Sequence, residues 1–284
     1  MPVSSSPASS GCPAPTRAGA GTWASAIGVV LVLALVAWVS GGCGRKEADA
    51  SSVTLVVSAA ADLRQALPEV ARRFTLETGV EVVFNFGSSG LLAQQIEQGA
   101  PVDVIFSANE SYVDELEEKR LVRSETRAVY GRGRLVLWTR PGSDVRVQDI
   151  QDLSLSEVRR VAIANPEHAP YGLAARQALE TAGLLDVVAP KLVLGENVLQ
   201  ALQYVESGNA EVGIVALSLV VKGGDTWVFV PESLHQPINQ TCAVIAGSAH
   251  VAEATRFVQF VNGTEGRTIM RSYGFVLPGE SPLQ

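Results

Sequence analysis

Residues 53–86 read VTLVVSAAADLRQALPEVARRFTLETGVEVVFNF. The stretch opens on a largely apolar run, and apolar residues then recur at the three- and four-residue spacing of one helix face as far as Phe74. Gly79 suits the end of that helix, and a second apolar run follows at residues 80–86. The pattern predicts a strand at residues 53–58, a helix and a second strand, which is the βαβ unit of a largely parallel sheet.

The same alternation continues along the chain. It predicts further strands at residues 102–106, 133–139, 160–164, 192–194, 212–216 and 241–246, and further helices at residues 91–96, 174–179, 198–205, 251–261 and 265–270. These units are too many for one compact sheet, so we expect an α/β fold of two lobes, each a mixed, mostly parallel sheet flanked by helices. Residues 53–133 and 245–284 would form lobe 1 and residues 134–244 lobe 2, with a hinge and a cleft between them.

Composition excludes several classes of function. The 22 Lys and Arg residues against 29 Asp and Glu residues give a net charge of −7, and no basic block is present, so a nucleic-acid partner is disfavoured. Cys12, Cys43 and Cys242 are the three cysteines, too few for a disulfide framework or a cysteine-rich zinc site. The sequence contains neither a P-loop nor a nucleophile elbow, and His168 has no second histidine nearby, so we expect no enzyme.

The N-terminus predicts export. Residues 23–39 carry no charge and follow a Ser-, Pro- and Gly-rich start whose basic residue is Arg17, which is typical of a signal peptide; a membrane anchor is the alternative. Residues 40–43, Ser-Gly-Gly-Cys, resemble a bacterial lipobox, although Ser40 stands where that pattern has Leu, Val or Ile. We expect residues 1–43 to be a signal peptide with lipidation at Cys43, and residues 44–52 to be a tether. Plain cleavage is the alternative.

Four short junctions between predicted strands and helices point to an anion site. They are residues 59–62, 87–90, 166–172 and 196–198, and none of them contains Lys or Arg. In an open α/β sheet the ligand lies at the carboxyl ends of the strands, where helix N-termini offer unpaired N–H groups to an anion. Taken singly, each junction also fits an ordinary turn or helix cap.

Six strings, taken in order, resemble the molybdate-binding solute receptors of ABC importers, which have the type II periplasmic binding protein fold. They are VSAAADL (57–63), FGSSGLLA (86–93), QQIEQGAPVDVIFS (94–107), NPEHAPYG (165–172), GIVA (213–216) and YGF (273–275). The resemblance covers residues 53–278. It implies a receptor that captures molybdate or tungstate outside the cytoplasmic membrane and hands it to an ABC permease, without a cofactor; we expect a monomer.

Carried over by position, the oxyanion contacts of that family fall on Asp62, Ser89, Tyr171, Val198 and Ala216, supported by Ala61 and Ser88. Ser89 retains the family serine, whereas Asp62 replaces a ligand serine and Ala216 a ligand tyrosine. The Tyr171 phenol could offset the missing hydroxyl at Ala216 by turning into the cleft. A carboxylate repels a dianion, so Asp62 would either cap its own helix and point away or accept the proton that phosphate carries.

Several alternatives remain open at this stage. The receptor could bind another tetrahedral oxyanion, such as sulfate or phosphate, and the choice between molybdate and tungstate is not made by the sequence. The rival from another class is an enzyme on the same fold, which is disfavoured because the junctions show no convergent His or Lys and no cofactor motif. For His168 we expect a hydrogen-bonded structural role rather than metal binding or acid–base catalysis.

Overall fold

The computed structural model describes residues 53–224 and 227–281. The predicted signal peptide at residues 1–43, the lipidation site Cys43 and the tether at residues 44–52 lie outside the described residues. Over the part of the chain that is described, no helix is long and apolar enough to cross a membrane.

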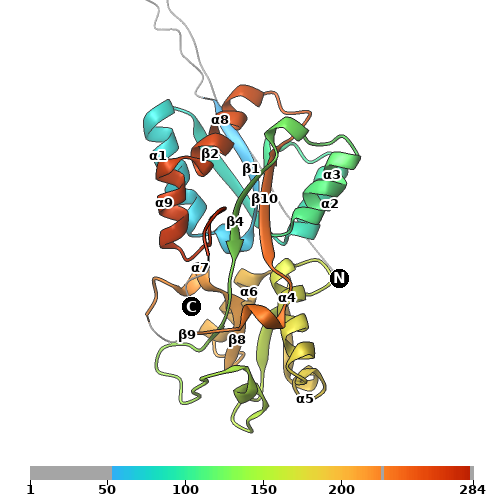
Figure 1. Cartoon of the computed structure of the whole chain (residues 1–284), viewed down its shortest axis with the longest axis vertical. Helices are drawn as coiled ribbons and strands as arrows, with labels where there is room; N and C mark the ends of the chain where they lie inside the picture. The colour runs from blue at the N-terminus through green and yellow to red at the C-terminus, as the bar shows by residue number, and fades with distance from the viewer. Residues whose placement is uncertain (1–52, 225–226, 282–284) are drawn as a thin grey trace, which may run out of the picture. The chain divides into compact units, whose positions relative to one another are not determined.

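The first lobe is built on a five-stranded sheet in the order β2-β1-β3-β10-β4 (Figure 1). Its strands are β1 (Thr54–Ala60), β2 (Glu81–Gly87), β3 (Val104–Ser107), β4 (Ala128–Gly133) and β10 (Ile238–Val244). Strand β1 runs parallel to β2 and β3, whereas β10 is antiparallel to both β3 and β4. Helices α1 (Ala66–Thr78), α8 (Val251–Asn262) and α9 (Thr264–Ser272) cover one face, and α2 (Ser89–Glu97) and α3 (Glu110–Glu118) cover the other.

The second lobe is built on a sheet in the order β7-β6-β8-β5-β9. Its strands are β5 (Leu135–Trp138), β6 (Val161–Ala164), β7 (Leu192–Gly195), β8 (Val212–Ala216) and β9 (Trp227–Phe229). Strand β6 is parallel to β7 and β8, and β5 is antiparallel to β8 and β9. The helices of this lobe are α4 (Pro170–Thr181), α5 (Leu185–Val188), α6 (Val198–Glu206) and α7 (Leu217–Val220). The two sheets confirm the predicted α/β fold of two lobes.

The return to the first lobe begins earlier in the chain than we predicted. Residues 134–244 were expected to belong to lobe 2, but β10 pairs with β3 and β4, with Thr241 opposite Ser107 and Ile238 opposite Gly133. The boundary at residue 245 is therefore wrong, and the return lies before Ile238. An apolar run shows that a strand forms, but only its hydrogen-bonded neighbours show which sheet it joins.

The junction after β1 also differs from the prediction. A 3-10 turn, η1 (Ala61–Leu63), separates β1 from α1, which begins at Ala66. Pro68 is thus the third residue of the helix, where its missing N–H removes no intrahelical bond. Gly79 ends the helix as expected, with a left-handed φ of 73°. Asp62 consequently lies in the turn and does not cap α1.

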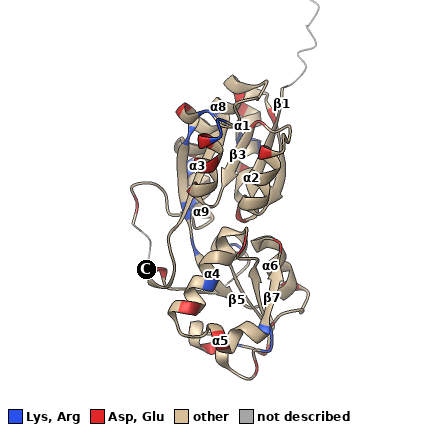
Figure 2. Cartoon of the chain, turned by 90° about the vertical axis from the view of Figure 1, so that its right-hand side faces the viewer, with Lys and Arg blue, Asp and Glu red and all other residues tan. Residues whose placement is uncertain are grey.

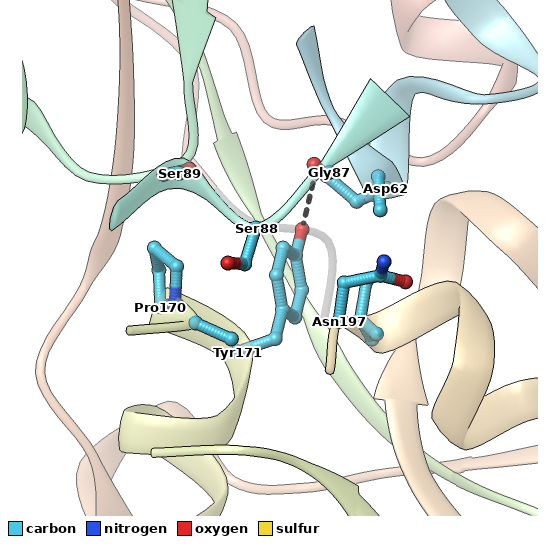
Figure 3. Close-up of a pocket in the computed structure, with 10 residues that line it drawn as sticks. Asp62, Gly87, Ser88, Ser89, Pro170, Tyr171 and Asn197 are labelled. Atoms are coloured by element: carbon cyan, nitrogen blue, oxygen red, sulfur yellow. Dashed lines mark hydrogen bonds between the residues drawn. The ribbon is translucent and has the colours of Figure 1, made fainter. Parts of the chain in front are cut away.

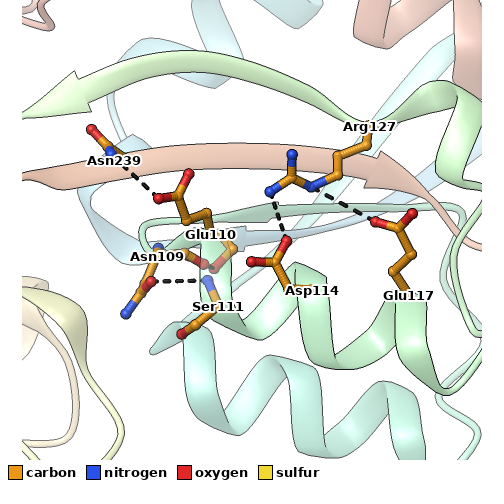
Figure 4. Close-up of polar contacts among 8 residues, drawn as sticks. Asn109, Glu110, Ser111, Asp114, Glu117, Arg127 and Asn239 are labelled. Atoms are coloured by element: carbon orange, nitrogen blue, oxygen red, sulfur yellow. Dashed lines mark hydrogen bonds and ion pairs between the residues drawn. The ribbon is translucent and has the colours of Figure 1, made fainter.

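Polar contacts hold α3 against the first sheet (Figure 4). Arg127, just before β4, approaches Asp114 at 2.6 Å and Glu117 at 3.8 Å. Asn239 of β10 donates to Glu110 at 3.4 Å, and the side chain of Asn109 caps the helix by accepting from the N–H of Ser111 at 3.0 Å. The acidic residues of α3, coloured red on the ribbon in Figure 2, are thus partly engaged in positioning the helix.

Candidate oxyanion-binding site

The site lies where strand ends of both lobes face one another. Strands β1 and β2 lead into η1 and α2 in the first lobe, and β6 and β7 lead into α4 and α6 in the second. A small cavity at this place is lined by Ala61, Asp62, Gly87, Ser88, Ser89, Ala169, Pro170, Tyr171, Asn197 and Val198 (Figure 3). Its volume is about 10 Å³, which is room for about one water molecule. A four-oxygen anion needs more space, so its entry requires the lobes to separate.

In the first lobe, Ser89 offers a hydroxyl. Ser88 is the N-cap residue of α2, with extended backbone angles, and Ser89 is the first residue of the helix. The Ser89 side chain is fully buried, and its Oγ accepts a hydrogen bond from the N–H of Ala108 at 2.9 Å. Because that bond uses a lone pair of Oγ, the hydroxyl hydrogen stays available to donate to an anion.

In the second lobe, two helix N-termini offer backbone N–H groups. Tyr171 is the second residue of α4, after Pro170, which has no N–H, and Val198 is the first residue of α6. N–H groups of a first helical turn have no acceptor within the helix. Asn197 caps α6 through its side chain, which accepts from the N–H of Gln200 at 3.1 Å. The Asn197 side chain therefore organises the helix end.

Asp62 does not point away from the cavity. Its Oδ2 accepts from the Tyr171 hydroxyl at 2.9 Å and from Nε2 of Gln240 at 2.7 Å, and Oδ1 has no hydrogen-bond partner among the described residues. Figure 3 shows the Tyr171 ring reaching from the second lobe toward this carboxyl group. Ser218 donates to the carbonyl oxygen of Asp62 at 2.8 Å. The expectation that Asp62 caps its own helix and faces away is wrong, because the 3-10 turn directs its carboxyl group toward the cleft.

Burial dominates the electrostatics of this carboxyl group. It raises the pKa of Asp62 from 3.8 to about 6, and the hydrogen bonds from Gln240, from Tyr171 and from the backbone N–H of Asp62 itself lower it only in part. No positively charged side chain among the described residues contributes to this pKa. Burial, together with the neighbouring Asp62 charge, also raises the pKa of the Tyr171 phenol well above its ordinary value. The Tyr171 hydroxyl therefore stays protonated and donates to Asp62.

Beside the cavity, the loop that precedes α4 forms hydrogen bonds to the first lobe. The Nδ1 of His168 lies 2.8 Å from the Ser88 Oγ, and the His168 carbonyl oxygen accepts from the N–H of Gly90 at 3.0 Å. A Cβ at Gly90 would lie 2.8 Å from that oxygen, so the contact requires glycine. His168 thus has the hydrogen-bonded structural role that the sequence predicted.

The predicted site residues gather with one exception. Ala61, Asp62, Ser88, Ser89, Tyr171 and Val198 line the cavity. Ala216 does not line it; this residue ends β8, where it pairs with Leu135 of β5. Gln240 was missed, since it lies inside β10, far in sequence from every junction, and no local pattern marks it. No group of three or more His, Cys, Asp or Glu residues in the described ranges is arranged to hold a metal ion.

Residues 55–276 match the family model described as bacterial extracellular solute-binding protein. The chain is 35% identical over 229 residues to the molybdate-binding protein ModA of Rhodobacter capsulatus, covering 80% of this chain and 90% of that protein. It is also 35% identical to ModA of Escherichia coli, covering 82% and 92%. The structure of the Azotobacter vinelandii periplasmic molybdate-binding protein aligns with a TM-score of 0.74 at 34% identity, over 79% of this chain and 99% of that one.

These matches extend over both lobes and include the four junctions that line the cavity. They confirm the resemblance drawn from the six sequence strings, and the alignment with a solved periplasmic binding protein confirms the predicted fold. The chain belongs to the bacterial extracellular solute-binding protein family, together with its molybdate-binding relatives.

Proposed function

We propose that this protein captures molybdate or tungstate in the cleft between its lobes and hands it to an ABC permease. One observation carries the proposal: strand ends of both lobes converge on a cavity whose lining contains no Lys or Arg but offers a buried hydroxyl and several helix N-termini. Helix N-termini and hydroxyls suit a tetrahedral oxyanion because they donate hydrogen bonds without a cationic side chain. Relatives that share both lobes are named for molybdate.

The available donors are strong enough for tight binding. Hydrogen bonds to a charged group contribute about 1.5–3 kcal/mol each, so about six of them bracket the −12 kcal/mol or so of a nanomolar complex. The net charge of −7 does not prevent this, because charges on the distant surface are screened over about 8–10 Å while donors in a closed cleft are not.

The chemistry of the cleft supports a receptor rather than an enzyme. Its lining has one carboxyl group, Asp62, which hydrogen-bonds to Tyr171 and Gln240, and the nearby His168 is bonded to Ser88. A catalyst of acyl or proton transfer needs convergent groups free to react with a substrate. We further propose, from the uncharged run at residues 23–39 and the lipobox-like residues 40–43, that this carrier is exported and held at the membrane by a lipid on Cys43, and that it is a monomer.

Phosphate is the second candidate ligand, and the unpartnered Oδ1 of Asp62 favours it. A carboxylate oxygen accepts a hydrogen bond from the proton that phosphate carries near neutral pH, whereas molybdate, tungstate and sulfate have no proton to offer.

Calorimetric titration of the purified, anion-free protein with molybdate, tungstate, sulfate and phosphate tests the proposal. We expect one site per chain for molybdate or tungstate, a raised melting temperature with the same anions and no chemical conversion of them. Absence of heat with all four anions would contradict the proposed function. Heat with phosphate alone would assign the second candidate, and turnover of a bound substrate would assign the enzyme class.

A further inference from the structure

Asp62 places an acceptor where an anion must bind. The side chain is fully buried and lines the cavity, and its Oδ1 has no hydrogen-bond partner among the described residues. An ionised carboxylate only accepts hydrogen bonds, and so does every oxygen of a fully deprotonated oxyanion. Two such groups cannot bond to each other in a closed, poorly solvated cleft unless a proton lies between them.

Among the described residues, no positively charged group contributes to the pKa of Asp62, so none takes the place of that proton. The charges of Asp62 and of the Tyr130 and Tyr171 phenols interact. Further titratable or charged groups on the neighbouring segments are Arg64 after η1, His168 before α4 and Cys242 in β10. Helix α7, the first turn of α6 and the carboxyl end of β2 contain no charged residue.

Each of these five groups is engaged elsewhere or stays neutral. Arg64 lies over the Phe86 ring, 5.4 Å from its centre, and His168 contacts Ser88. Burial raises the pKa of the Tyr130 and Tyr171 phenols well above their ordinary value, and it raises the pKa of the Cys242 thiol to about 12. Of the two titratable groups that line the cavity, Asp62 and Tyr171, Asp62 is the one that exchanges a proton near neutral pH.

We propose that the closed cleft holds one proton between Asp62 Oδ1 and the bound tetrahedral oxyanion. A fully deprotonated anion then binds together with one proton, which passes from the solvent to Oδ1 and is donated from there to an anion oxygen. Hydrogen phosphate brings its own proton and donates it to the ionised carboxylate. The inference rests on the proposed function and states the protonation state in which the same site binds its anion.

The proposal predicts a pH dependence with a definite sign. Where Asp62 of the empty protein is already protonated, below about pH 6, molybdate affinity is constant. Above that pH the proton must be taken up on binding, so affinity falls by roughly tenfold for each pH unit. The fall continues up to the pKa of the bound form, which the dianion raises further.

Calorimetry of the anion-free protein near pH 8, in two buffers that differ in ionisation enthalpy, measures the protons taken up. We expect about one proton per molybdate or tungstate and about none per phosphate. We also expect roughly a tenfold loss of molybdate affinity between pH 7 and pH 8. Binding of molybdate without proton uptake would overturn the proposal but leave the proposed function standing, whereas no heat with any anion would overturn the function itself.

Two variants locate the proton. Asp62→Asn keeps the shape of the side chain and cannot ionise, so its molybdate binding should lose both the proton uptake and the pH dependence. Asp62→Ser, which restores the hydroxyl of the resembling family, should do the same if the asparagine variant folds poorly. The matched variant His168→Asn should keep the uptake of one proton. Uptake that persists in either Asp62 variant, or that disappears in His168→Asn, would contradict the proposal.

Discussion

The two lobes contribute to the cavity in different ways. The first lobe brings side-chain groups to it, with the Ser89 hydroxyl buried beside the N-terminus of α2 and the Asp62 carboxyl in the turn after β1. The second lobe brings backbone N–H groups of α4 and α6, while the side chains there have structural partners: Asn197 caps its helix and the Tyr171 phenol bonds to Asp62.

Because of this difference, we expect anion binding to respond differently to side-chain substitutions in the two lobes. A side chain changed in the first lobe alters the chemistry offered to the ligand. In the second lobe a substitution acts on the ligand indirectly, by moving the backbone, by disturbing closure or, at Tyr171, by removing the hydrogen bond to Asp62. Four substitutions test the distinction, and the largest effect comes from the backbone of the second lobe.

Gly172→Ala should cause the largest loss of stability. A Cβ at Gly172 would lie 2.2 Å from the carbonyl oxygen of Ala164, which is backbone and cannot rotate away. We expect the free energy of unfolding to fall by about 3 kcal/mol or more and anion binding to be lost, because α4 must move away from β6. The control is Gly247→Ala, whose Cβ would meet nothing within 4 Å. Equal unfolding free energies for the two variants, measured in urea, would break the argument.

The strands and helices of each lobe were predictable from local patterns, because the spacing of apolar residues that distinguishes a strand from a helix is visible within a few consecutive residues. The predicted strand at residues 212–216 coincides with β8, and the helix predicted to end at Gly79 does so. The capping role of Asn197 also follows from its position before an apolar helix.

The arrangement of Asp62 was not predictable in the same way. Its orientation depends on where the 3-10 turn gives way to α1, and on Gln240 and Tyr171, which lie 178 and 109 positions further along the chain. Contacts of this kind depend on how the two sheets pack, and they produce no recognisable pattern of residue spacing in the sequence. The position of Ala216 outside the cavity lining, and the membership of β10 in the first sheet, have the same origin.

Asp62→Asn should change how stability depends on pH. Asp62 has its ordinary pKa of 3.8 in the unfolded chain and a pKa of about 6 in the folded protein, so between these pH values only the folded protein keeps the proton. The contribution of Asp62 to folding stability is therefore greatest below pH 3.8 and is lost as the pH rises through about 6. The shift corresponds to about 3 kcal/mol at order of magnitude. The free energy of unfolding of the anion-free protein, measured in urea, should fall less between about pH 4 and pH 7.5 for the variant than for the unchanged protein. An identical decline would mean that Asp62 is solvated.

Ser89→Ala should weaken anion binding more than it weakens the fold. The variant removes the hydroxyl that faces the ligand and also the acceptor of the Ala108 N–H. We expect a loss of about 1.5–3 kcal/mol in binding, roughly 10- to 150-fold in affinity, measured by calorimetry with molybdate. Ser88→Ala is the matched control, since the Ser88 hydroxyl is paired with His168 and should affect closure rather than ligand contact. An affinity loss confined to the Ser88 variant would reverse the assignment of the two serines.

Asn197→Ala should have the smallest effect on the ligand and so gives the sharpest contrast between the lobes. The substitution removes the cap that accepts from the Gln200 N–H, and loss of such a cap costs about 1 kcal/mol of stability. The N–H of Val198 stays in place, because the backbone of α6 is still packed against β6 and β8. Anion affinity measured on the folded protein should therefore change by no more than about twofold to fivefold, less than the 1.4 kcal/mol of a tenfold change. An affinity loss as large as that of Ser89→Ala would show that the second lobe also binds the anion through a side chain, and the contrast between the lobes would then fail.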